Sequence, residues 1–224
     1  MGALLVGIRL AFRGIQRNGL RSALTVLGIL IGVAAVVIVT ALGAGARLTE
    51  EDGRAIAREA VSVAAVAPSI RARGQLVVEN RNAETQVCGT TLAFFPVKAW
   101  DIVKGEAWTE HDEATKAKVL VLGSTVAEKL FPAEDAVGKT VRIGRYNYRV
   151  VGVLKPKGRA PFGGDQDDLA LMPIGSMRAR VFRTPPGFAG VLLVSARSAE
   201  TTDRAVAQLT SILRQRHRLT EGKE

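Results

Sequence analysis

The residues best suited to chemistry by type and spacing are the acids of segment 155–168, KPKGRAPFGGDQDD. Asp165, Asp167 and Asp168 offer carboxylate oxygens, the ligands that Ca²⁺ and Mg²⁺ prefer. A calcium-binding EF-hand loop also needs a further ligand, a glycine and a closing glutamate at fixed positions, and none of these follows Asp165. Because glycine and proline surround the acids, the sequence predicts a solvated loop and no metal site.

The string at residues 133–140 ends as a phosphate-binding P-loop does, with Gly138, Lys139 and Thr140. The P-loop motif requires a glycine where this chain has Ala133, and it must follow a strand and open a helix. Here a predicted helix comes first and a predicted strand follows. Gly138 is therefore expected to be a turn residue, and no nucleotide site or Walker A motif is predicted.

The remaining nucleophiles and metal ligands are scattered along the chain. His111 lies between two acids and His217 ends a basic helix, so they do not form a metal-binding set. Ser124 and Ser195 lack the G-x-S-x-G context of a nucleophilic serine. Cys88 is the single cysteine and is expected to be a small buried side chain. The sequence predicts no catalytic set, cofactor or metal, and hence no enzyme.

Residues 22–46 contain no charged side chain. At about 1.5 Å per residue, a helix of this length reaches roughly 37 Å, enough to cross a hydrocarbon core of ~30 Å. The run exceeds the ~7–15 apolar residues of a signal peptide, although Ala44-Gly45-Ala46 resembles a cleavage site. We therefore predict a retained transmembrane helix over 22–46, with a cleaved signal peptide as the alternative.

The segment 1–21 carries four arginines and no acidic residue: Arg9, Arg13, Arg17 and Arg21. Basic residues favour the cytoplasmic flank of a span, so residues 47–224 are predicted to be periplasmic. The four-residue spacing indicates an amphipathic cytoplasmic helix, with an unordered basic flank as the alternative. These charges account for much of the net charge of +10. The rest of the chain lacks a basic run with interleaved aromatics, so no nucleic-acid partner is expected.

Within the predicted span, Gly28 and Gly32 form a G-x-x-x-G motif. This motif allows a second helix to approach closely, and the second helix would come from another copy or another subunit. Glycines are also common in membrane helices without a packing role, so both interpretations stay open.

From residue 47 onward, strands and helices alternate irregularly, which indicates an α+β or mixed α/β fold. A helix is predicted at 49–59 with Thr49 as its N-cap, and the longest helix is predicted at 198–218. The apolar face of that long helix is Ala205, Leu209, Ile212 and Leu213. Strands are predicted at 61–67, 75–79, 84–90, 118–123, 139–143, 146–154, 169–174 and 190–197, shorter helices at 92–95, 124–131 and 176–182, and irregular structure at 100–108.

Two groups of strings resemble one family. The first group is RNGLRS (17–22), LTVLGILIGVAAV (24–36) and LGAGA (42–46). The second is VAP (66–68), VCGTT (87–91), VLGSTVA (121–127), VGKTVRI (137–143) and VVGVL (150–154). The most specific string is Phe162-Gly163-Gly164-Asp165-Gln166-Asp167-Asp168. Together they resemble the N-terminal span and periplasmic core domain of MacB-like (FtsX-superfamily) ABC transporter permeases.

The resemblance implies a porter-like lobe of βαβ units at 47–95 and 189–224, with a β-rich lobe inserted at 96–188. The chain also departs from the family pattern. Residue 46 leads almost directly into the helix at 49, so the first strand of the porter-like lobe is expected to be missing. The three further spans of the family do not follow, which implies a truncated permease or one piece of a split permease.

The function implied is that of an inner-membrane permease subunit of a MacB-like ABC exporter, which couples ATPase-driven motion to efflux of macrolides, peptides or lipophilic compounds. The implied partners are the lipid bilayer, a separate ABC ATPase subunit, a periplasmic membrane-fusion adaptor, and a second copy or the remaining permease spans. The loop 162–168 is the candidate contact surface. The alternative is a single-span anchored periplasmic binding or sensor module, although 21 cytoplasmic residues are too few for a signalling domain.

Overall fold

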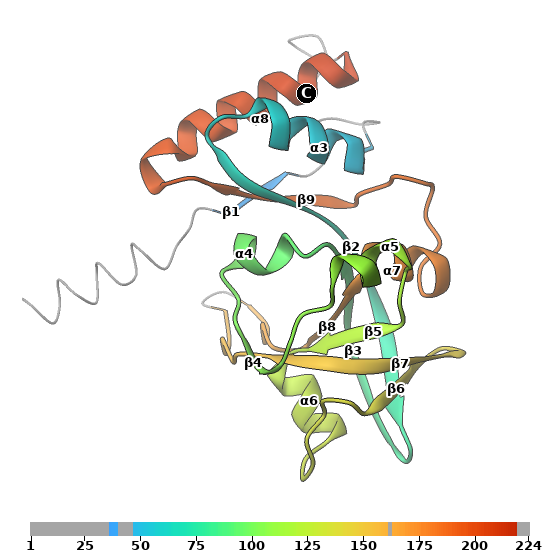
Figure 1. The fold of residues 1–224 in the computed structure, drawn as a ribbon. Coiled ribbons are helices and arrows are strands. Elements are labelled where there is room, and N and C mark those ends of the chain that lie inside the picture. The colour runs from blue at the N-terminus through green and yellow to red at the C-terminus, as the bar shows by residue number, and fades with distance from the viewer. Residues whose placement is uncertain (1–35, 40–46, 161–162, 219–224) are drawn as a thin grey trace, which may run out of the picture. The chain divides into compact units, whose positions relative to one another are not determined.

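The computed structural model of the protein describes residues 36–39, 47–160 and 163–218 (Figure 1). The predicted amphipathic segment, its four arginines, and Gly28 and Gly32 lie outside the described residues. Most of the predicted span lies outside them as well. No helix in the described part of the chain has the length and apolar character needed to cross a membrane.

Strand β1 (Val36–Val39) pairs antiparallel with β9 (Val191–Ala196). At these four residues the structure differs from the helix predicted over 22–46. Four consecutive β-branched residues favour a strand, but in an apolar run they look the same as part of a membrane helix. The strand also precedes the first described helix, where the sequence analysis expected a strand to be missing.

Two helices cover the end of the sheet formed by β1, β9 and the start of β2, and they lie together in Figure 1. They are α3 (Glu50–Glu59) and α8 (Thr202–His217), the latter preceded by the short helix η1 (Ala199–Thr201). Thr49 caps α3 as predicted. The four apolar side chains predicted to face inward from α8 are all buried, which confirms that face: Ala205, Leu209, Ile212 and Leu213.

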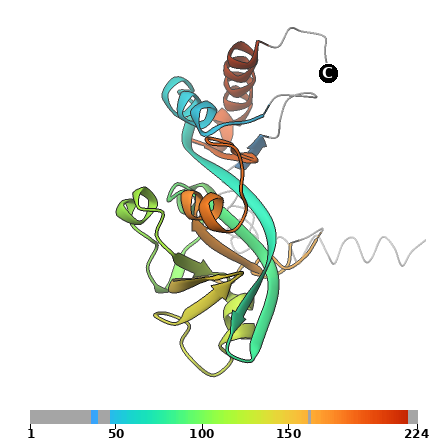
Figure 2. The same ribbon diagram turned by 90° about the vertical axis from the view of Figure 1, so that its right-hand side faces the viewer.

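The hairpin of β2 (Val63–Val78) and β3 (Arg81–Thr90) links this end of the sheet to the rest of the domain (Figure 2). The single strand β2 replaces the two short strands predicted at 61–67 and 75–79. Pro68 lies within it opposite Leu192 of β9. A proline is tolerated where its missing N–H is not needed by the ladder, so the proline did not end the strand.

The other strands close a barrel, because β2 pairs with β3, β3 with β8, β8 with β5, β5 with β7, β7 with β6, and β6 again with β2. Their bounds are β5 (Val119–Leu122), β6 (Thr140–Ile143), β7 (Tyr146–Leu154) and β8 (Leu169–Pro173). Strand β4 (Ile102–Gly105) pairs with β7 in a stretch that was predicted to be irregular.

Short helices accompany the barrel: α4 (Phe94–Lys98), α5 (Glu110–Ala114), α6 (Ser124–Leu130) and α7 (Ile174–Arg180). Helix α5 was not predicted, although Thr109 and Asp112 form a capping box at its start. Cys88 is buried as predicted, with its Sγ 3.0 Å from the Oγ of Ser69. The mixed α/β fold predicted from the sequence is confirmed.

Candidate functional site

The carboxylate of Asp167 organises the start of the predicted contact loop. Only 3% of Asp167 is exposed, and its oxygens accept hydrogen bonds from the backbone N–H of Lys157 at 2.9 and 3.1 Å and of Gly158 at 2.7 Å. The prediction of a solvated acid is therefore wrong for this residue. A buried carboxylate needs several donors, and the turn at residues 157–158 supplies them.

Asp165 attaches the same loop to helix α6. Its oxygens accept hydrogen bonds from Oγ1 of Thr125 at 2.6 Å and from the backbone N–H of Asp167 at 2.9 Å. The hydrogen bond from Thr125 is the larger reason why the pKa of Asp165 lies below its usual value. Asp168 pairs with Lys129 of α6 at 3.3 Å. The acids thus anchor the loop to α6 and to its own backbone.

The first part of the loop rests on Trp100. The indole Nε1 donates to the backbone carbonyl of Lys155 at 2.7 Å, and Nζ of Lys157 lies 4.7 Å from the ring centroid. Burial lowers the pKa of Lys157. Gly163 and Gly164 are exposed at the turn, whereas Phe162 lies outside the described residues. The described part of the loop therefore leaves Gly163 and Gly164 exposed, next to the anchored acids Asp165 and Asp167.

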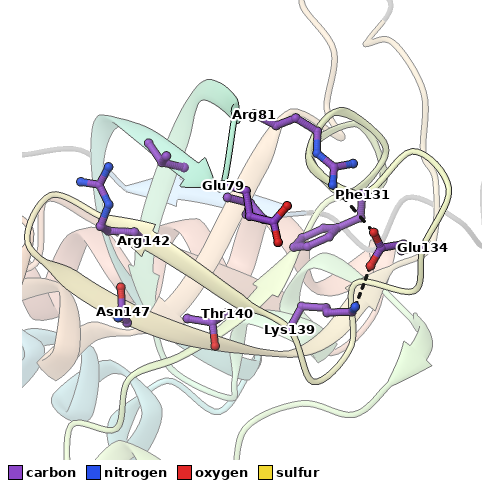
Figure 3. A pocket seen from close by; sticks show the side chains of 10 residues that line it. Glu79, Arg81, Phe131, Glu134, Lys139, Thr140, Arg142 and Asn147 are labelled. Atoms are coloured by element: carbon purple, nitrogen blue, oxygen red, sulfur yellow. Dashed lines mark hydrogen bonds and ion pairs between the residues drawn. The ribbon is translucent and has the colours of Figure 1, made fainter.

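A pocket of about 500 Å³ lies on another part of the barrel, where the β2–β3 hairpin and strand β6 meet (Figure 3). Its lining is mixed: apolar Val77, Val78 and Phe131, and polar or charged Glu79, Arg81, Glu134, Lys139, Thr140, Arg142 and Asn147. Lys139 and Thr140 were predicted to begin a strand, and this pocket was not predicted from the sequence.

Ion pairs fix one wall of this pocket. Nζ of Lys139 lies 2.6 Å from Oε2 of Glu134, and Nη2 of Arg81 lies 3.8 Å from Oε1 of Glu134 (Figure 3). The hydrogen bond between Lys139 and Glu134 lowers the pKa of Glu134 and raises the pKa of Lys139. Gly138 adopts a φ of 83°, the conformation expected of a turn residue.

A third cluster joins the start of α3 to the end of α8. Oδ1 of Asp52 accepts a hydrogen bond from Nε of Arg216 at 2.8 Å, and Oδ2 lies 3.0 Å from Nε2 of His217. Thr49 donates to the same carboxylate from its backbone N–H and its hydroxyl, each at 2.9 Å. Burial raises the pKa of Asp52, but these hydrogen bonds outweigh it and the pKa lies below 3.8. Asp52 thus forms an ion pair with Arg216 and a hydrogen bond with His217.

The other predicted residues are not brought together. Ser124 is the first residue of α6, and Ser195 lies buried in β9. Among the described residues, neither serine forms a hydrogen bond with a histidine. No group of histidine, cysteine and acidic side chains in the described part of the chain is arranged to hold a metal ion. The candidate features in the described part of the chain are therefore the loop, the pocket at β6 and the Asp52 cluster.

Comparison with known proteins places these features in a family. The profile described as MacB-like periplasmic core domain matches residues 45–212. The chain belongs to this family. The matched region contains the loop, the pocket and Asp52, whereas Arg216 and His217 lie just beyond its end.

Two curated relatives of this MacB-like domain are both called "Macrolide export ATP-binding/permease protein MacB". The protein of Syntrophobacter fumaroxidans is 34% identical over 231 residues, which is 87% of this chain and 32% of that protein. The protein of Rhodospirillum rubrum is 34% identical over 244 residues, 94% of this chain and 37% of that protein. The chain therefore spans about a third of the length of these relatives.

Solved structures share the fold of this MacB-like domain. The periplasmic region of MacB from Actinobacillus actinomycetemcomitans has a TM-score of 0.69 and 22% identity, over 84% of this chain and 87% of that one. The extracellular domain of the noncanonic ABC-type transporter YknZ from Gram-positive bacteria has a TM-score of 0.68 and 20% identity, over 83% of this chain and 96% of that one. The profile, the curated relatives and this shared fold together confirm the resemblance to the MacB-like periplasmic core domain.

Proposed function

We propose that this chain is the permease component, or part of it, of a MacB-like ABC exporter in the inner membrane. The match of the family profile to residues 45–212 is the observation that carries the proposal. The names of the relatives support macrolides as substrates, and peptides and lipophilic compounds remain further candidates. On this proposal, Arg9, Arg13, Arg17 and Arg21 hold the N-terminus in the cytoplasm, and the MacB-like domain lies in the periplasm.

The contacts of Asp52 support a coupling role for the domain. Helix α3 follows the predicted membrane segment, and its first turn is tied by Asp52 to the last turn of α8. A displacement of the chain that leads into α3 would therefore pull on α8 through the partly buried ion pair of Asp52 and Arg216. We propose that this connection carries motion from an ATP-binding component into the periplasmic domain.

The proposed partners follow from the same family. ATP hydrolysis is supplied outside these 224 residues, by an ATP-binding component of the kind that the relatives' names include. A periplasmic adaptor contacts the loop 162–168, in which Asp165 and Asp167 are hydrogen-bonded to the rest of the domain. A second copy, or further permease spans, packs against the predicted span through Gly28 and Gly32.

Export can be tested in cells that lack their own macrolide exporter. The transporter containing this chain, expressed with its ATP-binding and adaptor components, should raise the erythromycin concentration that inhibits growth. Asp167→Asn should reduce this protection at an unchanged membrane level, because the turn at residues 157–158 loses its anionic acceptor. The matched control is Asp203→Asn, an exposed acid in the first turn of α8. Absence of protection by the native transporter, with all components present, would refute export of macrolides.

A further inference from the structure

The barrel closes through a short ladder between β2 and β6. In the described ladders, these strands pair at two positions, Leu76 with Ile143 and Val77 with Arg142. By contrast, β2 pairs with β3 continuously from Ser69 to Val78. Beyond Val77 the two strands of the closing pair separate, because β2 turns into its hairpin with β3 while β6 begins at Thr140.

The pocket of about 500 Å³ occupies this separation. Its walls are the end of the β2–β3 hairpin on one side and β6 with its neighbour Asn147 on the other (Figure 3). Phe131 lies between them in the figure, and Val77 and Val78 complete the apolar part of the lining. The volume is within the range of about 300–1,000 Å³ that is usual for ligand sites.

The backbone of β6 offers hydrogen-bonding groups to this pocket. Ile143 and Tyr146 flank the two-residue turn of the β6–β7 hairpin, so they form a hydrogen-bonded pair. Hydrogen bonding alternates along an antiparallel ladder, which directs the N–H and C=O of Arg142 and Thr140 away from β7. Arg142 faces Val77 of β2, whereas Thr140 has a strand partner only in β7 among the described ladders. Thr140 is therefore an open edge at the pocket.

The charges around this edge are mainly positive. Glu134 is engaged by Lys139 and Arg81. Arg142 donates to the backbone carbonyl of Gly144 at 2.9 Å and has no acidic partner among the ion pairs of the described residues. Arg145, in the adjoining turn, lies over the ring of Tyr146 and adds a further positive charge.

One acidic side chain opposes this pattern. Glu79 lies in the hairpin turn with a φ of 48°, and its carboxylate faces the pocket (Figure 3). The basic side chains of the lining, Arg81, Lys139 and Arg142, nevertheless outnumber its acids, Glu79 and Glu134. An incoming carboxylate would therefore be attracted to the side of the pocket where Arg142 lies.

We propose that this gap binds an extended acidic segment of a partner protein. The segment adds to β6 at Thr140 as a short strand, places an apolar side chain against Phe131, and directs a carboxylate to Arg142. Main-chain hydrogen bonds at an open sheet edge provide affinity, and side chains that alternate along the added strand provide specificity. The inference does not depend on the transported substrate.

The test uses the full chain in detergent and a fluorescein-labelled, end-blocked peptide of alternating aspartate and valine. Fluorescence anisotropy should show saturable binding that weakens as salt is added. Arg142→Glu should weaken binding roughly tenfold or more, the factor expected from loss of a hydrogen bond to a charged group. The matched control is Arg58→Glu, an exposed arginine in the last turn of α3, which should bind as the native chain does. Arg142→Gln provides a second variant, and circular dichroism verifies that each variant is folded.

Two further peptides separate the parts of the proposal. A peptide of alternating lysine and valine should bind at least several-fold more weakly. An acidic peptide with N-methylated backbone amides should also lose affinity, because it cannot donate to β6. Equal binding of the lysine peptide, equal binding of the N-methylated peptide, or native affinity in folded Arg142→Glu and Arg142→Gln would each overturn the proposal.

Discussion

Replacement of Asp52 by asparagine should destabilise the domain more than replacement of any exposed acid. Asparagine keeps the size of the side chain and one carbonyl oxygen. It removes the negative charge of the carboxylate to which Arg216 and His217 are hydrogen-bonded. Each hydrogen bond to a charged group contributes about 1.5–3 kcal/mol net. Since the side chains of Arg216 and His217 are 31% and 20% exposed, solvent screening places each contact near the lower limit. We expect Asp52→Asn to lower the free energy of unfolding by about 2–3 kcal/mol.

The measurement is unfolding of the full chain in detergent, followed by circular dichroism. For a domain of this size, 1 kcal/mol shifts the melting temperature by about 2–4 °C, so the midpoint should fall by roughly 5–10 °C. Asp101→Asn is the matched control, because Asp101 pairs with Lys155 at 3.7 Å while its side chain is 75% exposed. An exposed pair contributes at most about 1 kcal/mol, so this variant should change the midpoint little.

Acidification should produce the same loss in the native chain. The folded pKa of Asp52 lies below the ordinary 3.8, so the carboxylate stabilises the fold fully above about pH 5. That contribution disappears as the pH falls through the folded pKa, and Asp52→Asn should lack this part of the acid dependence. A midpoint for Asp52→Asn within about 1 °C of the native chain, or an unchanged acid dependence, would refute the role given to this ion pair.

Two more predictions concern packing and topology. Gly123→Ala should destabilise the fold by about 1–3 kcal/mol in chemical unfolding, because its Cβ would lie 2.1 Å from the carbonyl oxygen of Asp167. Gly164→Ala, which meets nothing within 4 Å, should be neutral, and equal effects would contradict the reasoning. Arg73→Cys, at a side chain 87% exposed, should react with a membrane-impermeant maleimide in intact cells, whereas the native chain with only buried Cys88 should stay unlabelled. Labelling of Arg73→Cys only after inner-membrane lysis would reverse the predicted topology.

The sequence correctly predicted the features that depend on neighbouring residues, namely the spacing of apolar side chains and the capping of a helix. The inward face of α8 and the N-cap of α3 follow from spacing and from one threonine, so they are correct residue by residue. The length of β2 was missed because a proline such as Pro68 usually ends a strand. Only the pairing of β2 with β9 shows that the missing N–H of Pro68 is tolerated. Closure of the barrel depends on the pairing of β2 with β6, which are far apart in the chain and carry no signal for each other.

The same distinction explains why Asp167 was misjudged and why the pocket was missed. A run of glycine, proline and aspartate has the composition of a solvated turn whether or not one carboxylate folds back onto the backbone. Burial of Asp167 depends on the close approach of Gly123, whose place before α6 gives no indication of it. The pocket forms where two distant strands separate, so its lining has no spacing pattern in the sequence.

The contacts of Asp52 follow in part from features that are visible in the sequence. An acid at the third position of a helix is predicted to satisfy the N-cap, and Asp52 does so through Oδ2 with Thr49. Once the carboxylate is buried, its remaining lone pairs also require donors. The last turn of α8 carries the basic residues that a helix C-terminus favours, and two of these supply the donors. A single contact thereby stabilises the start of one helix and the end of another. We infer that a buried acid at the third position of a helix predicts contact with the basic last turn of another helix.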